Sequence, residues 1–222
     1  MNEADLRQQL LETARALNAS GINQGTSGNV SARIDGGLLI TPTSLPYEQM
    51  APEDLVALDF TGQPLGSVPA GQSQARRPSS EWRLHADILR SRPGAQAVVH
   101  CHSTSATALA CHGRGIPAFH YMVAIAGGSS VRCAPYALFG TQAFSDGALE
   151  ALAGRQAALL AHHGQVSVAG SLAQALRLAI EVETLARMYL QAMALGEPPV
   201  LSPEQMAAVQ QQFKTLLYAN TD

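Results

Sequence analysis

Two short apolar segments that end in histidine constrain the fold of this chain more than any other feature. Residues 95–102 read AQAVVHCH, and residues 155–164 read RQAALLAHHG. Both apolar runs are short, and the first contains the β-branched Val98 and Val99, so we predict two buried strands. Because α/β sheets place their sites at strand ends, the histidines are predicted to lie at a functional edge of a sheet.

The rest of the chain alternates between helical and strand-like patterns. Apolar residues recur at helical spacing from Leu6 to Leu17, and Gly21 follows where such a helix would stop. Residues 63–78 are rich in Gly, Pro and Ser and are expected to form a surface loop. Further strands are predicted within residues 23–34, 36–42 and 55–60, and further helices over residues 80–90 and 171–195. By itself, this alternation would indicate parallel strands.

Length and charge narrow the class of protein. A chain of 222 residues holds one substantial core, so we expect one domain over residues 1–222. Its net charge of −3, without runs of like charge, argues against general binding to nucleic acid or to anionic membranes. The opening MNEADLRQQL is neither a secretory signal nor a membrane span, so a cytoplasmic protein is expected. Three cysteines without CxxC spacing predict reduced thiols.

The histidines have the spacing of metal ligands. His100 and His102 are two residues apart on a predicted strand, so both imidazoles point to the same side. A pair of hydrogen-bonded core histidines is the alternative. The second strand adds His162 or His163 in the same region, and three imidazoles with an open fourth position describe a catalytic zinc site.

Glu81 precedes this strand at the first turn of a predicted helix. A carboxylate there is favoured by the helix dipole, and beside a cation it becomes a candidate general base. His85, one turn later, is the competing candidate for a ligand or an outer-shell group.

Cys101 faces the other side of its strand and is assigned to the core. His120 and Tyr121 are expected from spacing alone to be buried polar groups.

Three clusters of small polar residues have the composition of a phosphate pocket. Each offers hydroxyls or exposed backbone N–H groups, which also suit ordinary turns and helix caps. Neither a GxxxxGK[ST] nor a GxGxxG motif occurs, which weakens a nucleotide-binding interpretation. The clusters contain Thr26 and Asn29, Thr43 and Ser44, and Ser79 and Ser80.

Seven ordered segments resemble the class II aldolase/adducin family. They read NQGTSGNVS, ITPTSLPYE, PSSEW, AVVHCHS, IPAFHYMVAIAGG, CAPYALFGT and LLAHHG. The resemblance implies a three-layer α/β/α fold around a mainly antiparallel sheet. It also implies a cyclic homotetramer with active sites at subunit interfaces.

The same resemblance assigns roles to the candidate residues. It implies that His100, His102 and His163 bind zinc, with His163 chosen because it directly precedes Gly164. Glu81 is implied both as a metal ligand in the resting enzyme and as the base. The implied phosphate-binding loops contain Thr26, Asn29, Thr43, Ser44, Ser79 and Ser80. Tyr121 corresponds to a tyrosine of the family that reaches a neighbouring subunit's site and protonates the aldehyde oxygen.

The implied activity is reversible cleavage of a ketose 1-phosphate, such as L-fuculose 1-phosphate, to dihydroxyacetone phosphate and a short aldehyde such as lactaldehyde. Alternatives within the family are a 4-epimerase, a dehydratase or a decarboxylase acting on a sugar phosphate, with another divalent metal in place of zinc. A non-enzymatic binding protein like the adducins is disfavoured because the metal ligands and Glu81 are retained. The chain departs from the family's pattern in two places, which leaves the identity of the aldehyde open. The loop before Pro78 is longer, and the tyrosine that follows Thr215 directly in the family is replaced by Tyr218, three residues later.

Overall fold

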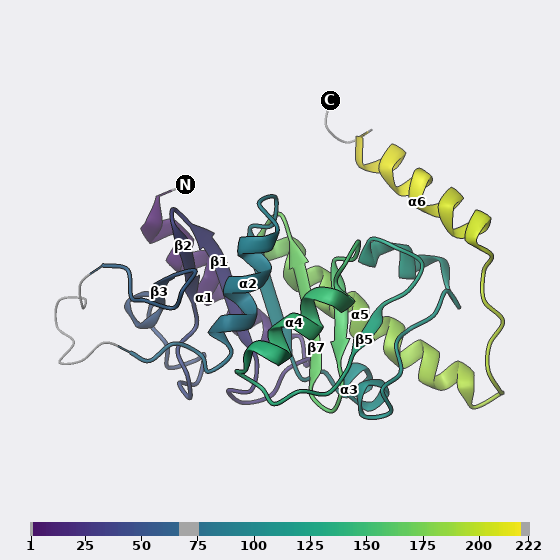
Figure 1. Ribbon diagram of the computed structural model, residues 1–222, viewed down its shortest axis with the longest axis horizontal. Coiled ribbons are helices and arrows are strands. Elements are labelled where there is room, and N and C mark those ends of the chain that lie inside the picture. Colours follow the sequence, from purple (N-terminus) through teal and green to yellow (C-terminus); the bar gives the residue numbers. More distant parts are fainter. Residues whose placement is uncertain (1, 67–75, 219–222) are drawn as a thin grey trace.

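The chain folds into a seven-stranded sheet covered by helices on both faces (Figure 1). The computed structural model describes residues 2–66 and 76–218, with the backbone alone for residues 217 and 218. The strand order is β3-β2-β1-β4-β7-β6-β5. The strands are β1 (Asn29–Ile34), β2 (Gly37–Ile40), β3 (Val56–Asp59), β4 (Ala97–Cys101), β5 (Arg132–Ala134), β6 (Ala157–Leu160) and β7 (Gly164–Ala169). The helices are α1 (Glu3–Ala19), α2 (Trp82–Ser91), α3 (Thr104–Cys111), α4 (Gln142–Ala151), α5 (Leu172–Met193) and α6 (Pro203–Tyr218), with short 3₁₀ turns η1 (Pro52–Asp54) and η2 (Tyr121–Ala126).

Antiparallel pairing dominates the sheet, as the family resemblance implies. Only β5 and β6 run parallel among the described strands. The expectation of parallel strands from alternation alone is wrong because short turns, rather than helices, join β1 to β2 and β6 to β7. Gly36 makes the first turn with φ 74°, a conformation that glycine adopts without steric cost.

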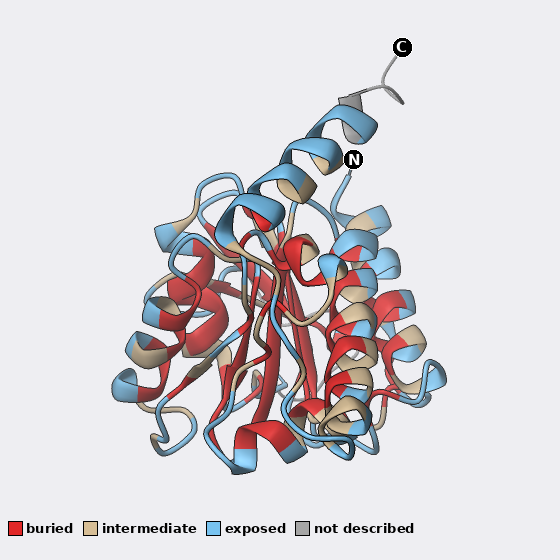
Figure 2. Cartoon of the chain, turned by 90° about the vertical axis from the view of Figure 1, so that its right-hand side faces the viewer, coloured by how far each residue is buried: buried red, intermediate tan, exposed pale blue. Residues whose placement is uncertain are grey.

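Three hydrophobic clusters, which pack against the two faces of the sheet, hold the layers together. Helices α1 and α5 cover one face of the sheet, and α2 and α4 cover the other. Strand β4 has every residue buried because both of its faces are covered, which explains its nearly continuous apolar sequence. Figure 2 shows the same arrangement, with buried strands inside and helices that expose only their outer sides.

The predicted helices and strands are found close to their expected bounds. Helix α1 ends at Ala19, and Gly21 follows with φ 76°. Ser171 caps α5 by accepting a hydrogen bond from the backbone N–H of Gln174. One boundary is wrong: α2 starts at Trp82, and Glu81 occupies the N-cap position without a side-chain capping bond. Of the loop predicted over residues 63–78, residues 67–75 lie outside the described part of the chain.

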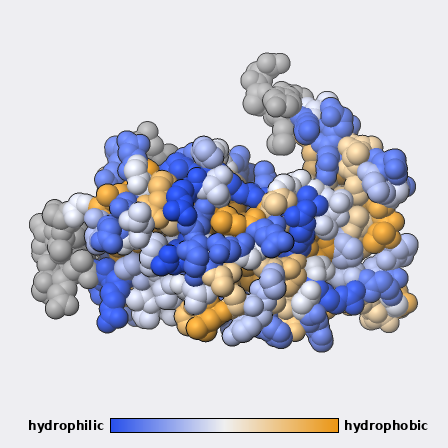
Figure 3. Space-filling view, viewed as in Figure 1, coloured by the Kyte–Doolittle hydropathy of each residue, from blue (hydrophilic) through white to orange (hydrophobic). Residues whose placement is uncertain are grey.

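Hydrophilic residues predominate on the face seen in Figure 3, with hydrophobic residues scattered among them. Single exposed apolar residues are normal on a protein surface. None of the described helices combines the length and the hydrophobicity needed to span a bilayer.

A carboxylate on α5 holds the start of α3, the helix that follows the histidines of β4. The backbone N–H groups of Ser105 and Ala106 donate to Glu183 at distances of 2.8 to 3.0 Å. The residue at the N-cap of α3, Ser103, makes no side-chain capping bond. Glu183 therefore supplies from a distant helix the acceptor that a local cap would provide.

We expect Glu183→Ala to lower the free energy of unfolding by about 1–2 kcal/mol, because the first N–H groups of α3 lose their acceptor. Chemical denaturation measures this change. Glu181→Ala on the same helix is the control, since no described residue donates a hydrogen bond to Glu181. Equal destabilisation by both substitutions would contradict the capping role.

Candidate active site

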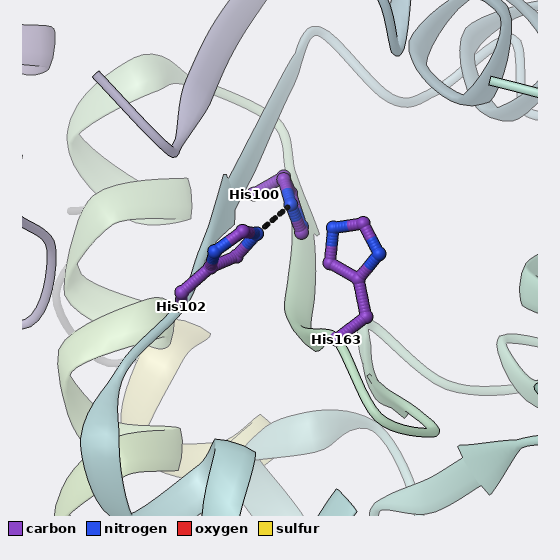
Figure 4. Close-up of side chains that lie close together, drawn as sticks. All are labelled: His100, His102 and His163. Carbon is purple, nitrogen blue, oxygen red and sulfur yellow. Dashed lines mark hydrogen bonds between the residues drawn. The ribbon is translucent and has the colours of Figure 1, made fainter. Parts of the chain in front are cut away.

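Three histidines converge at one edge of the sheet (Figure 4). His100 lies on β4 and is fully buried, His102 follows the end of that strand, and His163 lies in the turn between β6 and β7. One ligand nitrogen from each lies within 4.8 Å of the others. The ring centroids are 4.7 to 5.0 Å apart. The structure thus brings together the three histidines that the sequence analysis selects.

The turn that carries His163 has a specific local geometry. His162 adopts a left-handed φ of 57° and is exposed, with its ring 5.9 Å from that of Tyr136. Gly164 follows, where a Cβ atom would lie 2.4 Å from the carbonyl oxygen of Cys101. The glycine therefore allows β7 to approach the end of β4, and the turn directs His163, rather than His162, to the cluster.

Cys101 shows why the HxH spacing works. Its side chain is fully buried in the core between the sheet and helices α1 and α5, together with Val99. The residues on either side of it point away from that core and toward the cluster. The prediction that Cys101 belongs to the core is confirmed.

Glu81 reaches into the cluster from the start of α2. Its side chain is 5% exposed, with Oε2 lying 3.2 Å from His100 Nε2 and Oε1 lying 3.1 Å from His163 Nε2. Burial raises the pKa of the carboxyl group, but the charges of the adjacent His100 and His163 outweigh burial and hold this pKa well below its usual range. Glu81 is therefore a buried carboxylate in its ionised form.

The nitrogen lone pairs of the cluster fit a bound metal. His100 Nδ1 donates to the carbonyl oxygen of Gln165 at 2.8 Å, so Nε2 is the nitrogen that faces the cluster and that would offer its lone pair to a metal. That Nε2 atom faces His102 Nε2 at 3.1 Å. Burial and the charges of His100 and His163 lower the pKa of His102 to about 4, so its ring is neutral near pH 7.

Two further atoms of the site lack well-aligned hydrogen bonds. His163 Nε2 and Glu81 Oε1 are buried and face each other at 3.1 Å, but neither makes a well-aligned hydrogen bond to the other or to any other described residue. An unsatisfied buried polar atom is costly, and a cation shared by these atoms would remove that cost. Three imidazole nitrogens and one carboxylate are a donor set that zinc accepts.

The candidate phosphate residues lie on loops that approach the same edge of the sheet. The N–H of Thr43 donates to the carbonyl of Arg77, and the N–H of Ser79 donates to the carbonyl of Thr41, both at 3.0 Å. These bonds place the Thr43–Ser44 and Ser79–Ser80 clusters side by side.

The individual phosphate candidates differ in how free their side chains are. Thr26, Thr43, Ser44 and Ser80 are exposed. Ser79 is buried, and its hydroxyl accepts a bond of 3.3 Å from the N–H of Glu81. Asn29 is also buried, and its amide donates to Glu81 Oε2 at 2.8 Å. The side chain of Asn29 therefore contacts the carboxylate within the described structure.

Tyr121 lies outside the histidine cluster. Its ring contacts His120 and Phe213, with centroid distances of 4.7 and 6.3 Å. Tyr121 belongs to η2. The N–H of Gln156 donates to the carbonyl of Ala126, which places the end of η2 beside the start of β6. His163, in contrast, follows the end of β6. The expectation of a buried Tyr121 is wrong, because this residue is 49% exposed. The side chain of Tyr218 lies outside the described structure.

Two residues near the cluster escaped the sequence analysis. Phe144 of α4 stacks on His163 with ring centroids 5.0 Å apart and an angle of 29° between the planes. The carbonyl of Gln165 orients His100 through strand pairing. The role of a backbone carbonyl cannot be predicted from the type of residue that carries it. Phe144 lies on a helix that was not predicted from the sequence.

Known proteins share this fold and these segments. The family described as Class II Aldolase and Adducin N-terminal domain matches residues 8–190. The 5-methylthioribulose-1-phosphate/5-deoxyribulose-1-phosphate aldolase of Rhodospirillum rubrum is 47% identical over 210 residues, which cover 95% of this chain and 91% of that protein. The L-fuculose phosphate aldolase of Escherichia coli K12 is 45% identical over 216 residues, which cover 97% of each chain. A solved structure of an L-fuculose 1-phosphate aldolase has a TM-score of 0.89 and 36% identity, covering 96% of this chain and 98% of that one.

A layered α/β/α fold that gathers three imidazoles and a carboxylate at a sheet edge defines a metal-dependent enzyme. Together with the family match and the shared sequence, it shows that the chain belongs to the class II aldolase and adducin family. Within that family it is a class II aldolase, a metal-dependent aldehyde-lyase related to the fuculose-phosphate aldolases. The relatives named above are aldolases of small sugar phosphates.

We expect one divalent metal per chain, and we expect His163→Ala to lower metal affinity by more than about tenfold because one of three imidazoles is lost. His162→Ala is the matched control, since it removes the adjacent histidine, which points away from the cluster. Metal analysis after equilibrium dialysis measures both. Full metal content in His163→Ala, or equal loss in the two variants, would assign the ligands elsewhere.

Proposed function

We propose that the chain is a zinc-dependent aldolase that reversibly cleaves a ketose 1-phosphate to dihydroxyacetone phosphate and a short aldehyde. The observation that carries this proposal is the position of Glu81. It is a buried carboxylate within 3.2 Å of His100 Nε2 and 3.1 Å of His163 Nε2, where a base must lie to act on a metal-bound substrate. His100, His102 and His163 are the proposed zinc ligands, and Glu81 the proposed additional ligand in the resting enzyme.

Zinc bound here would act as a Lewis acid toward the oxygens of the ketose and stabilise the negative charge that remains when the C3–C4 bond breaks. Glu81 would take up a proton from solvent and deliver it to C3, and in the reverse direction its carboxylate would take the C3 proton of dihydroxyacetone phosphate and release it to solvent. Burial disfavours the charge of Glu81, so release of its contacts with His100 and His163 raises its pKa and makes it a stronger base. The same residue is thereby suited to both roles.

The phosphate group is proposed to bind on the loops that precede β1 and α2 and that follow β2. The exposed hydroxyls of Thr26, Thr43, Ser44 and Ser80 support this assignment, and Ser79 contributes from the same turn. Asn29 is proposed to lie where the phosphate loops and the metal ligands meet, since its side chain already contacts Glu81. Backbone N–H groups of these turns would complete an anion-binding nest.

The aldehyde end of the substrate is proposed to be apolar. Tyr136, Leu138 and Phe139 are 65%, 59% and 53% exposed and follow β5 in one loop. The Phe139 ring lies 6.4 Å from that of His163. The named substrates of the relatives in Rhodospirillum rubrum and Escherichia coli share a terminal carbon without a hydroxyl group, which such a surface would accept. We therefore propose a terminally deoxygenated ketose 1-phosphate, such as L-fuculose 1-phosphate or 5-deoxyribulose 1-phosphate.

The active site is proposed to be completed between the subunits of a homotetramer. Tyr121 is exposed and lies toward the other end of β6 from His163, which suits a residue that serves a neighbouring chain. In the condensation direction, its phenol would protonate the aldehyde oxygen. Each chain, residues 1–222, is proposed to act as one domain of this assembly.

We expect Glu81→Gln to keep its fold and its metal but to slow exchange of the C3 proton of dihydroxyacetone phosphate with solvent deuterium by about 10²–10⁴-fold. The amide cannot accept the proton. Asp87→Asn is the control, because Asp87 is another buried carboxylate on α2 whose bonds go to Arg90, Gln142 and Ser145. Wild-type exchange in Glu81→Gln would place the base elsewhere. Release of a 4-epimer instead of free aldehyde from the ketose phosphates would favour the epimerase alternative.

Tyr121→Phe should leave stability and C3 proton exchange nearly unchanged while carbon–carbon bond cleavage slows strongly, because only the phenolic proton is lost. A second expectation follows from a site shared between chains. Mixed oligomers of Tyr121→Phe and Glu81→Gln chains should regain part of the activity, since some sites would contain both intact groups. Recovery of no activity, with both parents still assembling, would contradict the intersubunit role.

A further inference from the structure

A chain of buried hydrogen bonds ends on the carboxylate of Glu81. His85 of α2 is fully buried, with Nδ1 lying 2.7 Å from Ser31 Oγ and Nε2 lying 2.5 Å from Asn29 Oδ1. The amide of Asn29 then donates to Glu81 Oε2 at 2.8 Å. Asn29 and Ser31 are two residues apart on β1, so both point to the side of the sheet that α2 covers.

The chemistry of the groups fixes the direction of each bond. A carboxylate only accepts, so Asn29 must turn its Nδ2 to Glu81 and its Oδ1 to His85. Because Oδ1 also only accepts, His85 Nε2 must carry the proton. Burial, with a further contribution from the charge of His100, lowers the pKa of His85 to about 3, so the ring is neutral and Nδ1 accepts from the Ser31 hydroxyl.

The Asn29 amide matters for the orientation of the Glu81 carboxylate. Apart from the imidazoles, it is the one side chain among the described residues that donates a hydrogen bond to this carboxylate. Glu81 lies at an N-cap but makes no capping bond there. When the imidazoles of His100 and His163 are engaged by a metal, the Asn29 amide remains to hold Oε2. The other oxygen, Oε1, lies 3.1 Å from His163 Nε2 without a well-aligned hydrogen bond, and it is the oxygen left to take a proton once a metal engages that imidazole.

We propose that Ser31 and His85 are positioning residues that act through Asn29 to hold Glu81 in the orientation needed for proton transfer. This inference rests on the proposed role of Glu81 as the base. His85 prevents the Asn29 amide from turning over, because the reversed amide would face Oδ1 toward the carboxylate and Nδ2 toward another N–H donor. Without that restraint, Glu81 would lose its fixed donor while the metal ligands stayed in place.

Two substitutions of His85 separate this role from packing. His85→Gln can keep an N–H donor near the position of Nε2, whereas His85→Asn is too short and retains a polar group only near Nδ1. We expect His85→Asn to slow C3 proton exchange by about 10–100-fold with little change in KM, in the range typical for loss of an outer-shell partner, and His85→Gln to recover much of that loss. Metal content should stay at the wild-type value in both.

Two serines provide a matched pair. Ser31 and Ser145 are both fully buried, and each makes a hydrogen bond from its hydroxyl to a side chain of α2, Ser31 to His85 and Ser145 to Asp87. Ser31→Ala should slow exchange, whereas Ser145→Ala should lower stability without slowing it. This pair also tests the proposal if His85→Asn fails to fold.

Ring ¹⁵N NMR of histidine-labelled protein provides a readout that does not depend on turnover. We expect His85, identified by the signals lost in His85→Gln, to be the neutral tautomer with the proton on Nε2. A proton on Nδ1, a charged ring near pH 7, or equal exchange rates in wild type, His85→Asn and Ser31→Ala would overturn the proposal. Absence of exchange in the wild type would instead contradict the proposed function itself.

Discussion

The antiparallel pairing of β4 with β7 is the interaction on which the site depends. It sets His100 opposite Val166 and Cys101 opposite Gln165, so the end of one strand meets the start of the other. The same pairing supplies the Gln165 carbonyl that takes the Nδ1 proton of His100. Gly164 permits the close approach, and the turn before it presents His163 beside His102. A one-residue shift in register would turn these side chains to the other face of the sheet.

The site gathers groups that would be unfavourable in an ordinary core. A carboxylate and three imidazoles lie close together at the edge of the sheet, with buried atoms that lack well-aligned hydrogen bonds in the described structure. Such a cluster costs folding free energy unless a cation is bound. The surrounding layers offset that cost, since apolar cores pack on both faces of the strands that carry the site. The candidate site is thus carried by strands that are packed on both faces.

Much of this arrangement could be predicted from sequence, for identifiable reasons. The apolar runs that end in His102 and His163 gave their strands directly, because buried strands with polar ends have few alternative interpretations. The choice of His163 over His162 required the resemblance, since only the left-handed turn at His162 distinguishes the two residues. Alternation of elements suggested parallel strands, because β7, which follows β6 after a short turn and pairs with it antiparallel, was not predicted.

Other features depend on contacts that are distant in sequence. Helices α3, α4 and α6 were not identified, and α3 depends on Glu183 of α5 rather than on a local cap. Asn29 was assigned to phosphate from its loop, while its side chain bonds to Glu81, 52 positions later. Tyr121 was expected from spacing alone to be buried, but the packing around η2 leaves it exposed.

The central claim is that three imidazoles and a carboxylate, without sulfur, form the metal site of this aldolase. X-ray absorption at the metal edge of the purified zinc protein tests it most directly. The account predicts nitrogen and oxygen neighbours at about 2.0–2.2 Å with the outer-shell scattering of three imidazoles. Sulfur neighbours at about 2.3 Å, or scattering from fewer than three imidazoles, would contradict it.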